Sequence, residues 1–135
     1  MIVVDSNVIA YCWLNGERTA LAHRLRRQDP EWHVPALWRS EMRSILVGYR
    51  RDGSLTDEQI FRVMEAAEAG VAGREHHLPN DRVFEVAGHS RLSAYDCEFV
   101  ALALILGARL VTEDRAILAA FPDFCSTMSQ HLGSQ

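Results

Sequence analysis

The chain has 135 residues and a formal net charge of −4, with 48% hydrophobic, 24% charged and 8% aromatic residues. This composition is typical of one globular domain, and it excludes disordered, collagen-like and low-complexity chains. The net negative charge argues against non-specific attraction of nucleic acid to the whole surface, so any nucleic acid must be held locally by arginines or by metal.

Short β-like segments alternate with helical segments along the chain. Strands are expected over residues 2–4, 32–34, 74–78, 109–111 and 124–127. Helices are expected over residues 6–14, 19–28, 35–51, 57–70, 81–91, 94–106 and 115–120. Strands separated by helices predict an α/β fold, with a mostly parallel sheet of about five short strands and helices on both faces.

Two of these helices carry clear start or stop signals. Thr56 and Gln59 have the spacing of a capping box at the start of one helix. Ser93 is the expected N-cap of the helix over residues 94–106, and Gly107 is its expected stop. These signals fix the ends of the two helices more firmly than periodicity does.

The C-terminal half of the chain carries further expectations. Asn80 should cap a helix whose inner face carries Val83, Phe84 and Ala87. No linker or repeat divides the sequence, so residues 1–135 are expected to form a single domain. The tail from about residue 128 is expected to fray.

Four carboxylates fall at strand ends or near the starts of helices. They are Asp5, Glu41, Asp96 and Asp114. In a parallel sheet, the carboxyl ends of the strands and the starts of the following helices share one edge, and ligands collect there. We therefore expect these four side chains to lie close together.

Three of these acids also have a purely structural interpretation. Asp5 and Asp114 could cap the helices that follow them, and Asp96 could close a capping box opened by Ser93. Glu41 is different, because it lies in an apolar stripe whose inner face carries no arginine. The other side of the helix is interpreted as a solvated face, and it carries Arg39, Arg43 and Arg50. A buried carboxylate without a partner is costly, so a metal or a cationic ligand is its natural partner.

Several carboxylates at one edge would repel each other unless a cation lies between them. Mg²⁺ and Mn²⁺ favour oxygen ligands, and they typically combine a few carboxylates with water and phosphate oxygens. The chemistry that suits such a cluster is metal-assisted hydrolysis of a phosphodiester bond.

Three stretches of the sequence carry a family resemblance. They are IVVDSNVIA (2–10), WRSEMRSIL (38–46) and LSAYDCEFVALALILGARLVTEDRAIL (92–118), with weaker matches in DGSLTDEQ and HHLP. On these motifs the chain resembles the PIN-domain family, and within it the VapC-like toxin ribonucleases. The resemblance implies a three-layer fold, Mg²⁺- or Mn²⁺-dependent endoribonuclease activity on RNA, a homodimer, and control by a small antitoxin.

The resemblance also assigns roles to single residues. It implies that the four acids already named are the metal-site and catalytic residues, with three neighbours in support. The supporting residues are Ser6, Asn7 and Thr112. Asp114 keeps the Thr-x-Asp spacing of the family, but neighbouring Glu113 is an alternative for that position. A contribution from Glu98 to the site also stays open.

Other functions are weighed against this one. A phosphatase of the haloacid dehalogenase kind needs an acid where this chain has Asn7, and a response regulator needs a lysine, of which the chain has none. A PIN-like binding module without catalysis and a nuclease that acts on DNA remain as alternatives. The sequence does not indicate which RNA would be cut.

The remaining signals concern location and the other potential ligands. The longest apolar run, from Phe99 to Leu106, falls short of the about 20 residues that a bilayer requires. The N-terminus lacks the basic region of a signal peptide, so a soluble cytoplasmic protein with no membrane contact is expected. The three cysteines are expected to be buried free thiols, and the six histidines are interpreted as structural or surface residues.

Overall fold

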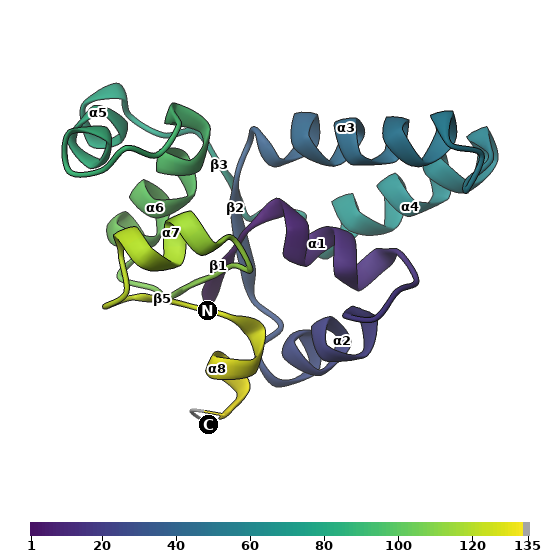
Figure 1. The fold of residues 1–135 in the computed structure, drawn as a ribbon, viewed down its shortest axis with the longest axis horizontal. Coiled ribbons are helices and arrows are strands. Elements are labelled where there is room, and N and C mark those ends of the chain that lie inside the picture. Colours follow the sequence, from purple (N-terminus) through teal and green to yellow (C-terminus); the bar gives the residue numbers. More distant parts are fainter. Residues whose placement is uncertain (134–135) are drawn as a thin grey trace.

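Five short strands form one parallel sheet in the order β3-β2-β1-β4-β5 (Figure 1). The strands are β1 (Ile2–Val4), β2 (Trp32–Pro35), β3 (Glu75–His76), β4 (Leu110–Val111) and β5 (Cys125–Ser126). The structure is a computed structural model, and it describes residues 1–133. With β1 in the centre, the residue that follows β1 lies in the middle of the carboxyl edge.

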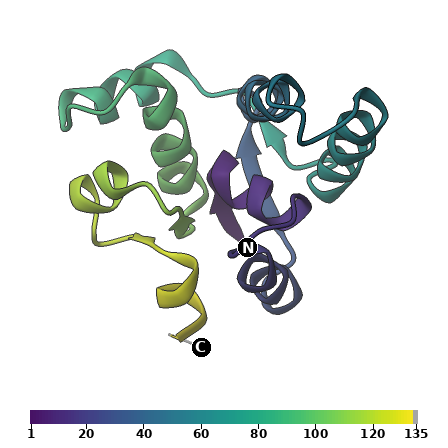
Figure 2. The ribbon, with the colours of Figure 1, turned by 45° about the vertical axis from the view of Figure 1, so that its right-hand side comes forward.

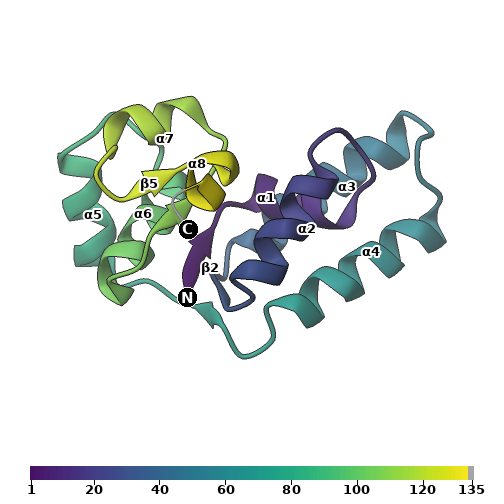
Figure 3. The ribbon, with the colours of Figure 1, turned by 90° about the horizontal axis from the view of Figure 1, so that it is seen from below.

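Helices cover the sheet on both sides. They are α1 (Ser6–Trp13), α2 (Thr19–Gln28), α3 (Trp38–Arg51), α4 (Asp57–Gly70), α5 (Asn80–Gly88), α6 (Ala94–Leu106), α7 (Arg115–Ala120) and α8 (Met128–Gly133). Figures 1 and 3 show α1 to α4 on one side of the strands and α5 to α7 on the other. The sheet is therefore the middle of three layers, which confirms the predicted α/β class.

The core lies between the sheet and these helices. All three residues of β1 are buried, as are the large side chains of Trp38 on α3 and Phe99 on α6. Helix α6 is apolar on nearly every side because it packs against β1, β2 and β4. Burying a side chain as large as Phe99 contributes about 2–3 kcal/mol, so these contacts hold the helices at fixed positions over the sheet.

The predicted helix ends are present. The Gln59 backbone N–H donates to the Thr56 hydroxyl, and the Gln59 side chain accepts from the Thr56 backbone, so the capping box at the start of α4 is complete. The Asp96 backbone N–H donates to the Ser93 hydroxyl at the start of α6. Gly107 ends α6 with a φ of +63°, a conformation that glycine adopts without strain.

The structure differs from the sequence prediction around α5. Phe84 was expected to face inward but is 68% exposed, whereas Val83 and Val86 are buried. The helix begins at Asn80 itself, with Pro79 before it, so the Asn80 side chain does not cap it. Val83, Val86 and Ala87 have helical i, i+3 and i+4 spacing and share the face of α5 that packs on α6, whereas Phe84 is rotated about 100° from Val83 and lies off that face.

Two further boundaries also differ. Pro35 is the last residue of β2, so α3 begins only at Trp38. The tail that was expected to fray instead forms helix α8, in which Met128 and His131 are buried. The backbone N–H of Met128 donates to the side chain of Glu113, and this long-range bond is invisible in local sequence. Residues 134–135 lie outside the described part of the chain.

Two other expectations can be compared with the structure. All three cysteines are free and buried, as predicted. Among residues 1–133, no helix combines the length and the apolar character that crossing a bilayer demands.

Candidate functional site

The structure brings all four predicted acids to one cavity at the carboxyl edge of the sheet. The cavity has a volume of about 330 Å³. It is lined by Asp5, Ser6, Asn7, Glu41, Ser44, Ile45, Asp96 and Asp114. Each acid arrives on a different element: the ends of β1 and β4, and the first turns of α3 and α6. The parallel topology therefore assembles residues that lie more than a hundred positions apart in sequence.

Asp5 is the most deeply buried of the four acids, with 7% of its surface exposed. Its Oδ1 accepts from the Ser6 backbone N–H at 2.7 Å, and its Oδ2 accepts from the Thr112 hydroxyl at 2.6 Å. Burial nevertheless raises the pKa of Asp5 to about 6, and repulsion from Glu41 and Asp96 adds to the rise. A cation in the cavity would relieve both effects.

The same repulsion connects the other acids. The Ser6 hydroxyl donates to Glu41 at 2.7 Å, but burial and the charge of Asp96 raise the pKa of Glu41. Burial also raises the pKa of Asp96, and the charge of Asp114 adds to it. A neighbouring carboxylate thus disfavours the ionisation of Asp5, Glu41 and Asp96, although hydrogen bonds from serine and threonine side chains partly oppose the effect.

Two of these acids both cap a helix and line the cavity. Asp5 caps α1 through Oδ1, as noted above. Asp114 caps α7, since its Oδ1 accepts from the backbone N–H groups of Ala116 and Ile117 at 2.9 and 3.1 Å. The caps fix the carboxylates in place, and the cap of Asp114 leaves its second oxygen without a bond to any described residue.

Thr112 connects the two acids that follow β1 and β4. Its hydroxyl donates to Asp5 and accepts from the Asp114 backbone N–H at 3.0 Å. Thr112 is fully buried, so neither bond competes with water. This one hydroxyl therefore sets the position of the loop after β4 relative to the end of β1.

Asn7 supplies a further oxygen at the cavity. Its Oδ1 is buried and has no hydrogen-bond partner among residues 1–133. Buried polar atoms almost always have a hydrogen-bond partner. A carbonyl oxygen without one, beside four carboxylates, suits a cation or a water molecule bound in the cavity. The donors at this cavity are carboxylate, amide and hydroxyl oxygens, which is the set that Mg²⁺ and Mn²⁺ prefer.

The carboxylates surround the cavity and do not converge on one point. Within the described chain, no three His, Cys, Asp or Glu side chains already form a compact set of metal ligands. An ion here would therefore keep several waters between itself and the protein. Mg²⁺ dehydrates reluctantly and commonly binds in this way, through one or two carboxylates plus water, so the residues present fit the ion.

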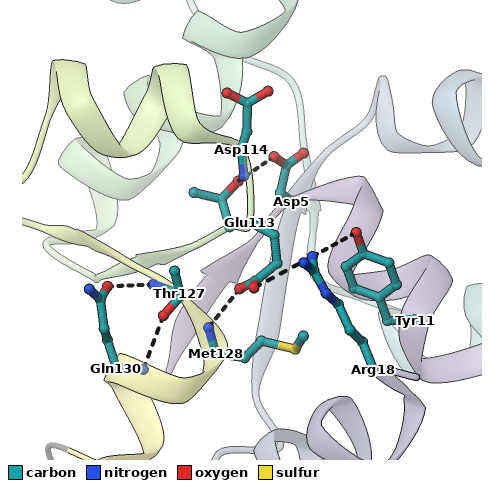
Figure 4. A network of polar contacts seen from close by, with 9 residues as sticks. Asp5, Tyr11, Arg18, Glu113, Asp114, Thr127, Met128 and Gln130 are labelled. Carbon is teal, nitrogen blue, oxygen red and sulfur yellow. Dashed lines mark hydrogen bonds and ion pairs between the residues drawn. The ribbon is translucent and has the colours of Figure 1, made fainter. Parts of the chain in front are cut away.

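The two acids that the sequence left open are not among the residues that line the cavity. Glu113 lies beside Asp114 but points away from it: its carboxylate accepts from the Met128 backbone N–H at 2.8 Å and lies 3.6 Å from the Arg18 guanidinium (Figure 4). Glu98 is near enough to Glu41 for that charge to raise its pKa, after the larger effect of burial. Glu113 therefore acts in the packing of α8, and Glu98 lies outside the cavity wall.

Sequence reasoning missed two residues of the cavity wall. Ser44 and Ile45 lie three and four positions after Glu41 on α3, so they share its helix face. That spacing was available in the sequence. It was overlooked because serine and isoleucine carry no ionisable group.

A histidine pair was also missed. His33 Nδ1 and His76 Nε2 are hydrogen-bonded at 2.8 Å across β2 and β3, and the other ring nitrogen of His33 lies 2.8 Å from Glu31. Burial and the neighbouring His33 lower the pKa of His76. The register of the two strands creates this contact, and local sequence does not predict a register.

Comparison with known proteins gives a family match and a curated relative. The PIN domain model matches residues 2–122. Ribonuclease VapC3 of Pyrobaculum aerophilum is 30% identical over 124 residues, which cover 90% of this chain and 95% of that protein. The matched region includes all four acids of the cavity.

Solved structures resemble the fold over nearly the whole chain. PAE2754 from Pyrobaculum aerophilum has a TM-score of 0.77 at 20% identity and covers 99% of this chain and 97% of its own. FitAcB from Neisseria gonorrhoeae has a TM-score of 0.74 at 16% identity, covering 96% and 99%. A toxin–antitoxin complex from Klebsiella pneumoniae has a TM-score of 0.69 at 17% identity, covering 95% and 98%.

Proposed function

Because the chain belongs to the PIN-domain family, we propose that it is a metal-dependent endoribonuclease that acts as the toxin of a toxin–antitoxin pair. The observation that carries this proposal is the cavity, where four carboxylates and an orphaned amide oxygen meet without a cationic side chain in the wall. The similarity to a VapC ribonuclease supports RNA as the substrate.

The proposed catalytic and metal-binding residues are the four acids of the cavity. They are Asp5, Glu41, Asp96 and Asp114. Mg²⁺ or Mn²⁺ held there would neutralise charge on the phosphodiester and lower the pKa of an attacking water molecule. In hydrolysis, one oxygen–phosphorus bond forms to the water and one breaks to the leaving ribose oxygen, so no redox partner is required.

The other residues of the site have supporting roles in this proposal. The Ser6 hydroxyl orients Glu41, and the Thr112 hydroxyl orients Asp5 and the loop of Asp114. Asn7 offers its free oxygen to the ion or to a water in the cavity. The hydrogen bonds to Glu41 and Asp5 favour their ionised forms and so oppose part of the rise in pKa that burial causes.

Toxin control is the second part of the proposal. One solved structure with a similar fold is a toxin–antitoxin complex, and the curated relative is named Ribonuclease VapC3. An acidic cavity open to solvent is a suitable receptor for an arginine or lysine side chain from a small antitoxin. We also propose that the chain is one PIN domain over residues 1–135, is a homodimer and acts in the cytoplasm.

Cleavage of defined nucleic acids tests this function. The purified chain should cut single-stranded RNA in Mg²⁺ or Mn²⁺, should stop in excess chelator, and should leave DNA of the same sequence intact. Ca²⁺ should support little turnover, because its looser geometry positions water and phosphate poorly. Cleavage of DNA alone would favour a DNA nuclease. RNA binding without cleavage in any metal would favour a binding module.

Growth and capture experiments test the toxin role separately. Expression of the active chain should arrest growth, and co-expression of the small protein encoded beside it should restore growth. An active nuclease that neither slows growth nor captures a small partner would contradict the toxin assignment while leaving the nuclease assignment intact.

A further inference from the structure

A second hollow begins one helical turn away from the acidic cavity. Helices α1 and α3 run side by side away from the sheet edge (Figures 1 and 2). Asn7 and Ile45 line the acidic cavity, and the residues four positions further along the same helices, Tyr11 and Tyr49, line a neighbouring hollow of about 400 Å³. Four residues of α-helix span about 6 Å, which is of the order of one extended nucleotide.

The hollow presents aromatic rings that are accessible from solvent. Tyr49 is 40% exposed and lies on the α3 side. Tyr11 lies on the α1 side, partly buried, and its hydroxyl accepts from the Arg18 guanidinium at 3.2 Å. Tyrosine rings stack on any of the bases, so a pair of them at a groove favours single-stranded nucleic acid over a specific small molecule.

Arg18 gives the hollow a positive group in a fixed place. Its guanidinium lies 5.2 Å from the centre of the Tyr11 ring and 3.6 Å from Glu113 (Figure 4). The side chain is 48% exposed, and its contacts with Tyr11 and Glu113 both use Nη1. An acidic cavity repels a nucleic acid backbone, and a nearby arginine that is already oriented offsets this repulsion by binding phosphate.

We propose that Tyr11, Arg18 and Tyr49 form a nucleotide subsite beside the acidic cavity. In this subsite, the base of the nucleotide next to the cleaved bond stacks on Tyr49, and its phosphate contacts Arg18. The inference rests on the proposed function, because the chain must act on RNA. The subsite would hold a nucleotide that lies outside the metal site.

The lining favours RNA over a peptide as the occupant. Polar groups of Asn15, Glu17 and Thr19 share the hollow with the tyrosines. The adjoining hollow, further from the acids, is lined by apolar groups such as Trp13 and Leu55, which suit a peptide better. The hollow lies one helical turn from the acidic cavity along α1 and α3, so a base stacked there would belong to a nucleotide next to the phosphodiester at the acids.

Binding of a labelled RNA tests the subsite. The probe is a fluorescein-labelled, twelve-nucleotide single-stranded RNA of mixed sequence, and the full chain carries Asp96→Asn to prevent cleavage. Tyr49→Ala should weaken binding about tenfold, because stacking on one aromatic ring is worth about 1–3 kcal/mol per base. Tyr49→Phe should restore most of the affinity. Phe61→Ala removes a ring that is 69% exposed on α4 and serves as the matched control, with unchanged affinity.

Arg18 has its own measurement. Arg18→Ala should lower affinity at low salt and reduce the slope of log K against log salt by about one, as expected for one lost phosphate contact. Arg18→Lys should retain that slope. Loss of affinity with no change in slope would show that Arg18 acts only through Tyr11, and would remove the phosphate contact from the proposal.

A base-by-base experiment locates the subsite on the RNA. In cleavage assays without the Asp96 change, Tyr49→Ala should raise KM more than it lowers kcat. RNAs with a single abasic nucleotide should show one position, next to the cleaved bond, at which the wild type and Tyr49→Ala become equal. Such coupling between a side chain and one base identifies a direct contact.

The outcomes distinguish this inference from the proposed function. If the wild type cleaves RNA but Tyr49→Ala has the same KM and affinity, the subsite is wrong and the nuclease stands. If Tyr49→Ala affects only the binding of an antitoxin peptide, the hollow belongs to the partner and the subsite is again wrong. If the wild type neither binds nor cleaves RNA, both proposals fail.

Discussion

Helix α3 carries one acidic cluster on each side, and the two clusters are balanced differently. On one side, Arg39 donates to both oxygens of Glu75 at 2.7 and 2.9 Å and to Glu68 at 2.8 Å, which joins α3, β3 and α4. On the other side, Glu41 lies in the acidic cavity with no cationic side chain in the wall. Helix α3 thus supplies its own cation to one cluster and none to the other.

The pKa values of the two clusters shift in opposite directions. Hydrogen bonds from Arg39 lower the pKa of Glu75, whereas burial and mutual repulsion raise the pKa of Asp5 and Glu41. Arg39 was expected to lie on a solvated face, but the register of β3 brings Glu75 to it. A paired cluster stabilises the fold, while an unpaired one costs stability and is typical of a functional site.

The largest expected effect separates the clusters by activity. Asp96→Asn should reduce RNA cleavage about a hundredfold or more, because the charge stabilisation supplied by a bound metal is worth several kcal/mol. Glu68→Gln removes an acid from the paired cluster and should leave cleavage near the wild-type rate. Initial rates on a single-stranded RNA measure both, and equal losses in the two variants would contradict the distinction.

Removing one acid from each cluster should change the stability of the metal-free protein in opposite directions. The pKa of Asp5 rises from 3.8 to about 6, and about two units correspond to about 3 kcal/mol. Asp5→Asn should therefore stabilise the metal-free protein by about 2 kcal/mol, since the amide nitrogen that replaces Oδ2 cannot accept from the Thr112 hydroxyl and this loss offsets part of the gain. Glu75→Gln should instead destabilise it by about 1 kcal/mol, because Arg39 and the Trp38 indole lose a charged acceptor.

Urea unfolding in chelator measures these two changes. A loss of stability in Asp5→Asn that equals the loss in Glu75→Gln would contradict the interpretation that the cavity acids repel each other.

The pH dependence of the metal-free protein sharpens the comparison. Asp5 has a raised pKa in the folded state, so its penalty is absent below about pH 4 and develops as the pH rises through about 6. Glu75 has a lowered pKa, so its contribution is present above its ordinary pKa and is lost as the pH falls below it. The gain from Asp5→Asn should therefore be near zero at pH 4 and full at pH 7. A gain independent of pH would contradict the assignment.

A smaller effect should come from Glu113, which joins the loop after β4 to α8. Glu113→Gln keeps an oxygen for the Met128 N–H but loses the ion pair with Arg18, whose N–O distance is already 3.6 Å. We expect a destabilisation of about 0.5–1 kcal/mol, typical of a partly exposed pair. Thermal unfolding tests it. A large loss of RNA cleavage in Glu113→Gln at a temperature where the variant is still folded would return Glu113 to the catalytic candidates.

Much of the architecture is predictable because local signals and global topology agree. The apolar run of β1, the capping box at Thr56 and the stop at Gly107 each identify an element without tertiary information. The co-location of Asp5 and Asp114 followed from a topological rule, since the parallel strands that precede them end at one edge. These inferences need no knowledge of side-chain contacts.

The errors all depend on contacts across the fold. Helix α8 is held by Glu113, the pair of His33 and His76 by strand register, and Arg39 by Glu75. Phe84 was misplaced because the packing of α5 on α6 selects the face of Val83 and Val86, and adjacent residues in a helix point about 100° apart. Local sequence pattern predicts that a helix exists. Packing decides which of its faces is buried and which side chains from distant elements contact each other.

The most direct test of the central claim is the effect of Mg²⁺ on unfolding of the wild type and of Asp96→Asn. If the four acids form a metal site, the metal-free variant should be about 1 kcal/mol more stable than the wild type, since one repelling charge is removed. Millimolar Mg²⁺ should stabilise the wild type through linkage and the variant much less. Equal responses to Mg²⁺, with no gain for the metal-free variant, would show that Asp96 takes no part in metal binding and would contradict a metal site built from all four acids.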